Sequence, residues 1–112
     1  MEKFNFDYDL ENDDLFVYLE GKKSSGAIEL GNFIIDFDIK GNLVAIQILN
    51  VSDILKKFFY KIKEITEITE IKTDIVNFRN MEGIKFCIST NTEQEQVNFL
   101  IPHIKEKSPV LI

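Results

Sequence analysis

Alternating apolar and polar positions predict that the chain begins with a β-hairpin. Phe4, Phe6 and Tyr8 alternate with polar residues, and a second apolar run occupies residues 15–19. A period of two is typical of a half-buried strand. The residues between the two runs are mostly Asn, Asp and Glu, and Asn and Asp favour turns because their side chains bond the local backbone. Further strands of this half are predicted at residues 27–30, 33–38 and 43–49.

A glycine predicts how two of these strands are joined. Asp38 suits the first position of a type I turn, and Gly41 can supply the left-handed backbone conformation of the bulge that follows such a turn. Residues 33–49 are therefore predicted to form a tight hairpin.

Apolar residues at spacings of three and four predict one helix after this hairpin. Ser52 is the predicted N-cap, because a serine hydroxyl accepts hydrogen bonds from amides two or three residues on. The apolar stripe consists of Ile54, Leu55, Phe58, Phe59 and Ile62. Isoleucine then recurs at every third residue up to Ile71, a period that fits neither a helix nor a strand. We predict that the helix ends near residue 66 and that a strand begins near residue 70.

The remaining sequence predicts a meander. Its strands are expected at residues 75–78, 84–90 and 96–101, with a turn at 80–83. The predicted fold class is α+β: an antiparallel β-sheet built from hairpins and a C-terminal meander, with one main α-helix packed on one face. A single domain is expected over 1–112, in which 1–54 hold the hairpins and the helix start and 55–112 the helix and the meander.

Composition narrows the class of protein. Hydrophobic residues make up 45% of the chain, ten of them Phe, so a core can form without disulfides. Cys87 is the only cysteine, which fits a reducing compartment. No segment has the apolar length of a membrane span, and the first residues lack the layout of a signal peptide. We therefore expect a small soluble cytoplasmic protein with no membrane partner.

Charge points to the kind of partner. The net charge of −6 argues against nucleic acid, because phosphate binding needs a basic field. Acidic residues concentrate at 7–14, whereas lysines concentrate at 53–63. An acidic patch can dock on a basic partner, although it can equally be a solvated loop.

Two groups of acidic residues are candidates for a calcium site. Asp36, Asp38 and Gly41 occupy the first, third and sixth positions of a helix–loop–helix calcium loop. Lys40 and Gln47 then stand where that loop needs an oxygen ligand and a bidentate glutamate, so a hairpin with two exposed acids is the simpler interpretation.

A looser calcium site would need two hairpins to meet. Asp7 and Asp9 lie in an oxygen-rich loop that could share a hard cation with Asp36 and Asp38 if the hairpins were neighbours. These four aspartates are the candidate metal ligands, and calcium is the only cofactor that the sequence suggests.

The sequence lacks a recognisable catalytic constellation. Cys87 and His103 fall in different predicted elements, so the thiol is interpreted as a small side chain that fills space and the histidine as a surface residue. Neither a phosphate-cradling loop nor a nucleophile elbow is present. An enzyme would need carboxylates such as Asp9 and Asp36 in one pocket with raised pKa values.

The first half of the chain resembles a known prokaryotic family. The motifs that carry the resemblance are Phe-Asp-Tyr-Asp at 6–9, Asp-Leu-Phe-Val-Tyr-Leu at 14–19 and the run at 35–52 that contains Asp-x-Asp-x-x-Gly. They resemble the uncharacterised family called domain of unknown function 2283. The family pattern differs at four positions, where this chain has Ala45, Gln47, Asn50 and Val51; two of these replace acids by amides. The resemblance implies a small β-rich fold and no established activity.

These observations rank three classes of function. A non-catalytic protein-interaction module comes first, with a second copy of the chain or a basic protein as its partner. A calcium-binding protein that uses the acidic hairpin turns is the alternative. An enzyme comes third.

Overall fold

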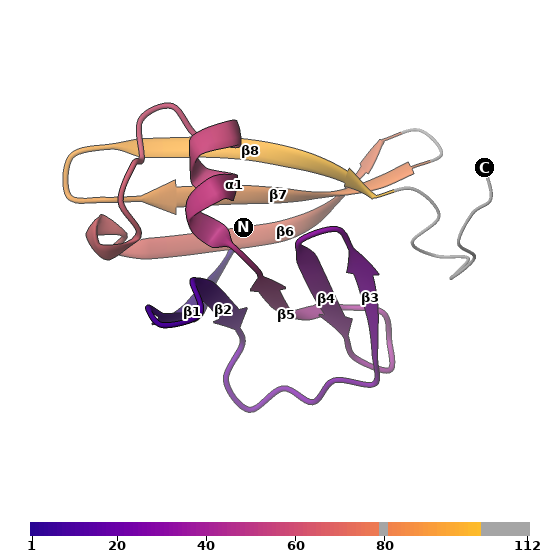
Figure 1. Ribbon diagram of the computed structural model, residues 1–112. Helices are drawn as coiled ribbons and strands as arrows, with labels where there is room; N and C mark the ends of the chain where they lie inside the picture. The colour runs from indigo at the N-terminus through magenta and orange to yellow at the C-terminus, as the bar shows by residue number, and fades with distance from the viewer. Residues whose placement is uncertain (79–80, 102–112) are drawn as a thin grey trace.

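The structure is a computed structural model that describes the backbone of residues 1–78 and 81–101, and side chains up to Val76 and from Gly83 to Leu100. The described residues form one α-helix, α1 (Val51–Phe58), a short 3₁₀ turn, η1 (Ile65–Glu67), and eight strands. Figure 1 labels the helix and the strands. The strands are β1 (Glu2–Asp9), β2 (Asp14–Tyr18), β3 (Gly26–Leu30), β4 (Phe33–Phe37), β5 (Leu43–Ile48), β6 (Glu70–Phe78), β7 (Met81–Ser89) and β8 (Gln94–Ile101).

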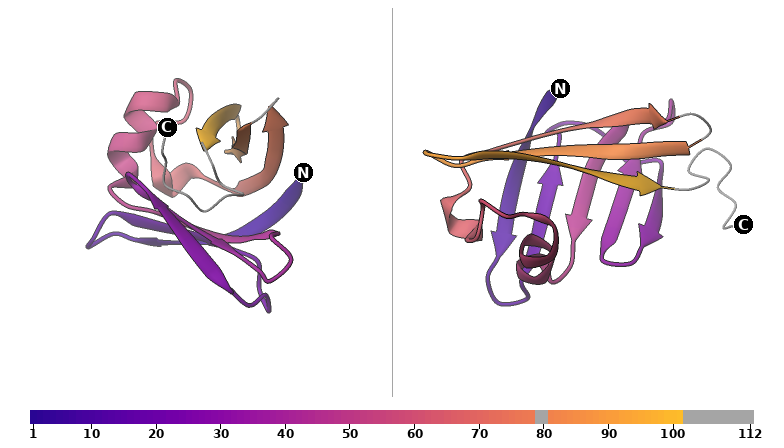
Figure 2. Two further views of the ribbon diagram at one scale, coloured as in Figure 1. Left: turned by 90° about the vertical axis from the view of Figure 1, so that its right-hand side faces the viewer. Right: turned by 90° about the horizontal axis from the view of Figure 1, so that it is seen from above.

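All eight strands belong to one antiparallel sheet. Their order is β3-β4-β5-β2-β1-β6-β7-β8. Strand β1 joins the two parts of this sheet, because residues 2–4 pair with β6 and residues 5–9 pair with β2. The sheet bends at this strand into a half-barrel, so that β1–β5 form one layer and β6–β8 lie across it (Figure 2). The predicted antiparallel sheet of hairpins with a C-terminal meander is confirmed.

The concave side of the half-barrel holds the hydrophobic core. Strands of both layers contribute fully buried side chains, such as Val17 and Ile46 from one and Ile71 from the other. Helix α1 adds Val51, Ile54 and Leu55 to the same cluster. The two layers also meet through aromatic rings: the ring centroids of Phe33 in β4 and Phe99 in β8 are 4.9 Å apart.

The turn between β4 and β5 is the predicted one. The Gly41 amide donates to the Asp38 carbonyl at 3.0 Å, and the Asp38 amide donates to the Asn42 carbonyl at 2.9 Å. Gly41 has a φ of 85°, the left-handed conformation that a residue without a side chain adopts at little cost.

The predicted helix end near residue 66 is wrong. Helix α1 ends at Phe58, and Phe59 is already extended, with φ −116° and ψ 130°. The chain then passes through extended backbone and η1 before it enters β6 at Glu70. The isoleucines at period three are nevertheless all buried, namely Ile62, Ile65, Ile68 and Ile71. A mixed conformation can bury every third residue, which neither regular element can do.

The predicted N-cap is also wrong. Asn50 holds the N-cap position in left-handed conformation, with φ 52°, and its side chain makes no capping hydrogen bond. The hydroxyl of Ser52 donates to the carboxylate of Asp13, in the turn between β1 and β2, at 2.8 Å. The cap therefore comes from a distant part of the sequence.

The predicted turn at 80–83 is displaced. Strand β7 begins at Met81, and Gly83 lies within it, opposite Val76 of β6 and Leu100 of β8. This position in the strand requires glycine, because a β-carbon there would lie 2.8 Å from the Phe99 carbonyl oxygen. His103 and the rest of the C-terminal tail lie outside the described residues.

Candidate functional site

The outer face of strands β1–β5 is left uncovered by the other described helix and strands. Helix α1 and strands β6–β8 all lie on the other side of this layer (Figure 2, left). Alternation along β2 explains the division: Leu15 and Val17 are buried in the core, whereas Phe16 and Tyr18 point outward.

Strand register places the outward residues in two rows across the layer. One row contains Asp7, Phe16, Gln47, Ile34 and Glu29. The neighbouring row contains Asn5, Tyr18, Ala45, Asp36 and Ala27. Both rows combine apolar or aromatic side chains with carboxylates.

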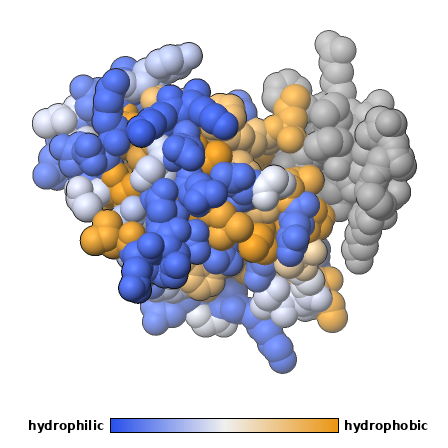
Figure 3. Space-filling model, viewed as in Figure 1, coloured by the Kyte–Doolittle hydropathy of each residue, from blue (hydrophilic) through white to orange (hydrophobic). Residues whose placement is uncertain are grey.

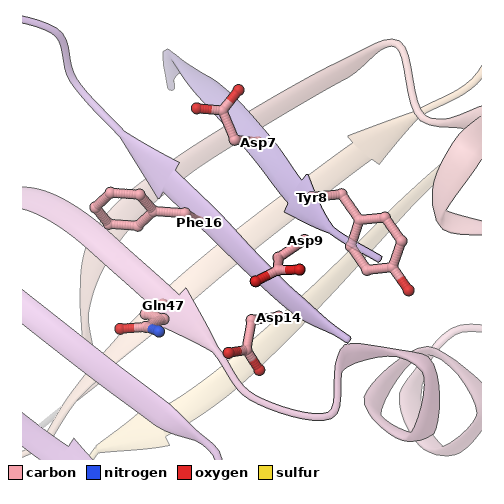
Figure 4. Close-up of a pocket in the computed structure, with 6 residues that line it drawn as sticks. All are labelled: Asp7, Tyr8, Asp9, Asp14, Phe16 and Gln47. Carbon is pink, nitrogen blue, oxygen red and sulfur yellow. The ribbon is translucent and has the colours of Figure 1, made fainter. Parts of the chain in front are cut away.

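A shallow hollow of about 310 Å³ lies at one end of these rows (Figure 4). Phe16, which is 46% exposed, forms its apolar wall. The other residues that line it are Asp7, Tyr8, Asp9, Asp14 and Gln47. We call this feature the Phe16 hollow. It joins one accessible aromatic ring with three carboxylates.

Tyr18 holds one side of the Phe16 hollow in place. Its hydroxyl donates to Asp7 Oδ2 at 3.2 Å, and this hydrogen bond to a carboxylate raises the pKa of Tyr18. The rings of Tyr18 and Phe16 pack with their centroids 5.3 Å apart. The aromatic pair and Asp7 are thus ordered before any ligand binds.

Asp9 holds the other side through the turn that follows β1. Asp9 Oδ1 accepts hydrogen bonds from the amides of Glu11 and Asn12, and Oδ2 accepts one from the Asn12 side chain at 2.8 Å. The Asn12 side chain is the largest cause that lowers the pKa of Asp9, so Asp9 stays ionised. Among the described residues, Asp14 has neither a hydrogen bond through its side chain nor an ion pair.

The electrostatics of this face are one-sided. The two rows and the hollow carry Asp7, Asp9, Asp14, Glu29 and Asp36 and contain no lysine or arginine. Both ion pairs among the described residues involve Glu70, with Lys3 and with Lys72, away from the hollow. The face therefore presents a negative field around exposed aromatic surface.

The four predicted metal ligands occupy three places. Asp7 and Asp9 share the Phe16 hollow. Asp36 lies on β4, three strand spacings from β1, or about 14 Å. Asp38 lies in the β4–β5 turn, where its Oδ1 accepts from the amides of Lys40 and Asn42 at 2.9 and 2.8 Å. In the part of the chain that the structure describes, no three His, Cys, Asp or Glu side chains gather as metal ligands.

The space beneath α1 and the surroundings of Cys87 are weaker candidates for a ligand site than the Phe16 hollow. The space between α1 and the sheet measures about 10 Å³ and is lined by apolar side chains, so it can neither hold a ligand nor stabilise a water. Cys87 is buried on the convex side of β7, where its Sγ accepts a hydrogen bond from Gln94 at 3.1 Å.

Sequence reasoning missed Phe16 and Gln47 as site residues, and it placed Asp14 only within the acidic run at 7–14. The signal was present in β2, where Asp14, Phe16 and Tyr18 alternate with Leu15 and Val17. Alternation shows that Phe16 shares a face with these polar residues, but only the register with β5 places Gln47 beside it.

The fold and this surface define a small, mostly antiparallel β protein with an acidic, aromatic outer face. The sequence model of the family described as "Protein of unknown function (DUF2283)" matches residues 5–52. This match confirms the resemblance predicted for the first half of the chain. The matched segment contains β2–β5 and all of the Phe16 hollow.

Two curated relatives each match less than half of this chain. An uncharacterised protein of Methanocaldococcus jannaschii is 52% identical over 50 residues, which cover 45% of this chain and 43% of that protein. A Methanosarcina mazei protein, named provisionally as a hypoxanthine phosphoribosyltransferase, is 40% identical over 48 residues, or 43% of this chain and 39% of that protein. The similarity thus spans about two-fifths of the length of each relative.

Neither a solved structure nor a membrane-spanning helix helps to define the function. No solved structure matches this chain significantly. None of the helices in the described ranges has the length and apolar character needed to cross a membrane.

Proposed function

We propose that this protein is a non-catalytic interaction module whose outer face binds a basic segment of a partner protein. The single observation that carries the proposal is the exposed ring of Phe16 between the carboxylates of Asp7, Asp9 and Asp14. An arginine or lysine side chain can lay its aliphatic stem on the ring and direct its cation toward the carboxylates. The accessible chemistry therefore fits a cation attached to an apolar stem.

The small free energies of single contacts require a partner with several cations. A cation–π contact at an exposed site contributes about 0.5–1 kcal/mol, and an exposed ion pair contributes roughly 0.2–1 kcal/mol. One side chain would therefore bind weakly. A partner peptide with several cations that also reaches Asp36 and Glu29 along the two rows could add several such contacts. The negative field of the outer face would speed the encounter of this peptide with the sheet.

The proposal is tested by the binding of a fluorescent nona-arginine peptide at about 0.15 M salt. The double variant Asp7→Asn/Asp14→Asn removes two charges from the Phe16 hollow. The matched control Glu29→Gln/Asp36→Asn removes two charges from the same face outside it. We expect the first variant to weaken binding about tenfold and the control to weaken it less than threefold. Equal losses would contradict a site at the hollow and would indicate only a diffuse field.

Calcium remains the alternative, with less support. Asp36 and Asp38 lie too far from Asp7 to share an ion with it. Calorimetric titration of the same protein with calcium chloride separates the two functions. Saturable calcium uptake that Asp7→Asn abolishes would favour the cation site over the peptide site.

A further inference from the structure

A second charged surface lies at the end of α1. Residues 54–63 contain Lys56, Lys57, Lys61 and Lys63 and no acidic residue, in a chain whose net charge is −6. Two aromatic side chains are exposed among these lysines: Phe58 is 42% exposed and Tyr60 is 81% exposed. We call residues 56–63 the basic segment. In Figure 3, hydrophilic side chains cover the helix, and hydrophobic surface lies between it and the β3–β4 hairpin.

Glu95 of β8 fixes the backbone of the basic segment. Its Oε2 accepts a hydrogen bond from the Tyr60 amide at 2.7 Å, and its Oε1 accepts from the amides of Lys61 and Ile62 at 2.7 and 3.3 Å. Tyr60 is therefore presented on an ordered backbone although its side chain is exposed. Binding through this segment would lose little conformational entropy of the backbone.

Helix α1, which begins the basic segment, lies on one side of the β1–β5 layer (Figure 2, left). The ring of Phe16 points away from the other side, because Phe16 alternates in β2 with the buried Leu15 and Val17. One copy cannot place its own basic segment on its own hollow. A two-fold dimer brings the same patch of each subunit together, whereas a contact between two different patches on opposite sides repeats as a chain or closes as a ring.

From this complementarity we infer that the basic segment of one copy docks on the Phe16 hollow of the next, so that the protein associates head to tail. The inference rests on the proposed function and names the partner: a second copy of this chain. Tyr60 and Phe58 would meet the Phe16 and Tyr18 rings, while lysines of the segment would face Asp7, Asp9 and Asp14. Contact between two outer faces is disfavoured because both are acidic.

Charge reversal on each surface tests the docking. Variant one is Asp7→Lys/Asp14→Lys. Variant two is Lys57→Glu/Lys63→Glu, which leaves Lys56 and Lys61 because these two lower the pKa of Asp13 and Glu95. Sedimentation velocity is run from 20 to 200 µM at 50 mM and 500 mM NaCl, after circular dichroism has shown that each variant is folded.

The expected results are specific to a head-to-tail contact. The parent protein should gain mass with concentration at low salt and return to monomer at high salt. Each variant alone should stay monomeric, since its two surfaces now carry the same sign of charge. An equimolar mixture should associate again, because each reversed surface has a complement on the other variant. Tyr60→Ala should weaken the association of the parent protein.

Two outcomes overturn this inference without touching the proposed function. The parent protein could bind nona-arginine yet remain monomeric at 200 µM in low salt. It could also associate while the mixed variants do not, which would place the contact elsewhere. Failure of the parent protein to bind nona-arginine would instead overturn the proposed function, and this inference with it.

Discussion

The carboxylate of Asp13 caps α1 through Ser52, a residue 39 positions further along the chain. Asp13 Oδ1 accepts from the Ser52 hydroxyl at 2.8 Å, and Oδ2 accepts from the Ser52 amide at 3.2 Å. The hydroxyl of Tyr8 donates to Oδ1 as well, at 2.7 Å. Burial alone would raise the pKa of Asp13, but the hydrogen bonds from Tyr8 and Ser52 outweigh it and lower the pKa. All three residues lie within the family match at 5–52.

This contact predicts two opposing effects at position 13. Asp13→Ala removes the cap and keeps a β-carbon at the φ of 57°, so it should lower the free energy of unfolding by about 1 kcal/mol. Asp13→Gly also removes the cap, but a residue without a β-carbon relieves the left-handed strain, so this variant should be about 1 kcal/mol more stable than the alanine variant. Urea denaturation of both variants measures the two effects. An alanine variant as stable as the parent protein would show that the cap contributes nothing.

The Asp13 cap also shows where sequence reasoning ends. Ser52 was correctly placed at the start of the helix, because the apolar stripe and the preceding strand bracket it. Its role was wrong because a local rule assigns the cap to a neighbour in sequence, whereas the acceptor comes from the β1–β2 turn. Pairing of β1 with β6 and of β2 with β5 escaped prediction for the same reason: alternation defines a strand's faces but not its distant neighbours.

Local signals were sufficient where one short segment decides the structure. Asp38 and Gly41 predicted their turn, and alternation predicted most strands. The candidate site was predicted in part: Asp7 and Asp9 do lie at the surface that we propose for binding. Asp36 does not join them, because β2 and β5 separate its strand from β1, and strand order is not encoded in local spacing.

Two glycines should respond differently to the same substitutions. Gly41 has a φ of 85° and open space around it, whereas a β-carbon at Gly83 would meet the Phe99 carbonyl oxygen. Alanine at Gly41 should cost about 1 kcal/mol through strain, and alanine at Gly83 about 2 kcal/mol through overpacking. Asparagine, which tolerates the left-handed region, should recover most of the loss at Gly41 and none at Gly83. Recovery at both positions in thermal melts would contradict the assigned cause at Gly83.

Thr73 predicts a stabilising substitution. Its side chain is 1% exposed, and its Oγ1 has no hydrogen-bond partner among the described residues. Thr73→Val keeps the shape and removes the buried hydroxyl, so the free energy of unfolding should rise by about 1 kcal/mol. Thr73→Ser is the matched control: it keeps the hydroxyl, removes a methyl group and should destabilise. Urea midpoints that move in the same direction for both variants would refute this explanation.

Glu95 predicts a loss of stability in acid. Burial would raise its pKa, but the amides of Tyr60, Lys61 and Ile62 outweigh burial and lower it below the ordinary value of 4.5. A carboxylate whose pKa is lower in the folded state stabilises the fold above the unfolded pKa, and this contribution disappears as pH falls through the folded pKa. The expected window therefore lies below about pH 4.5.

Glu95→Gln isolates this contribution from that of the other acids. The neutral side chain should lower the free energy of unfolding at pH 7 by about 1.5 kcal/mol. Its NH2 group cannot accept a hydrogen bond from a backbone amide, and its remaining carbonyl oxygen carries no charge. The difference between variant and parent protein should shrink as pH falls below 4.5, where Glu95 itself becomes neutral. Urea unfolding at pH 7, 5 and 3 provides the measurement, and Glu93→Gln, two residues away and exposed, is the control. A difference that stays constant down to pH 3 would mean that the charge of Glu95 does not anchor the basic segment.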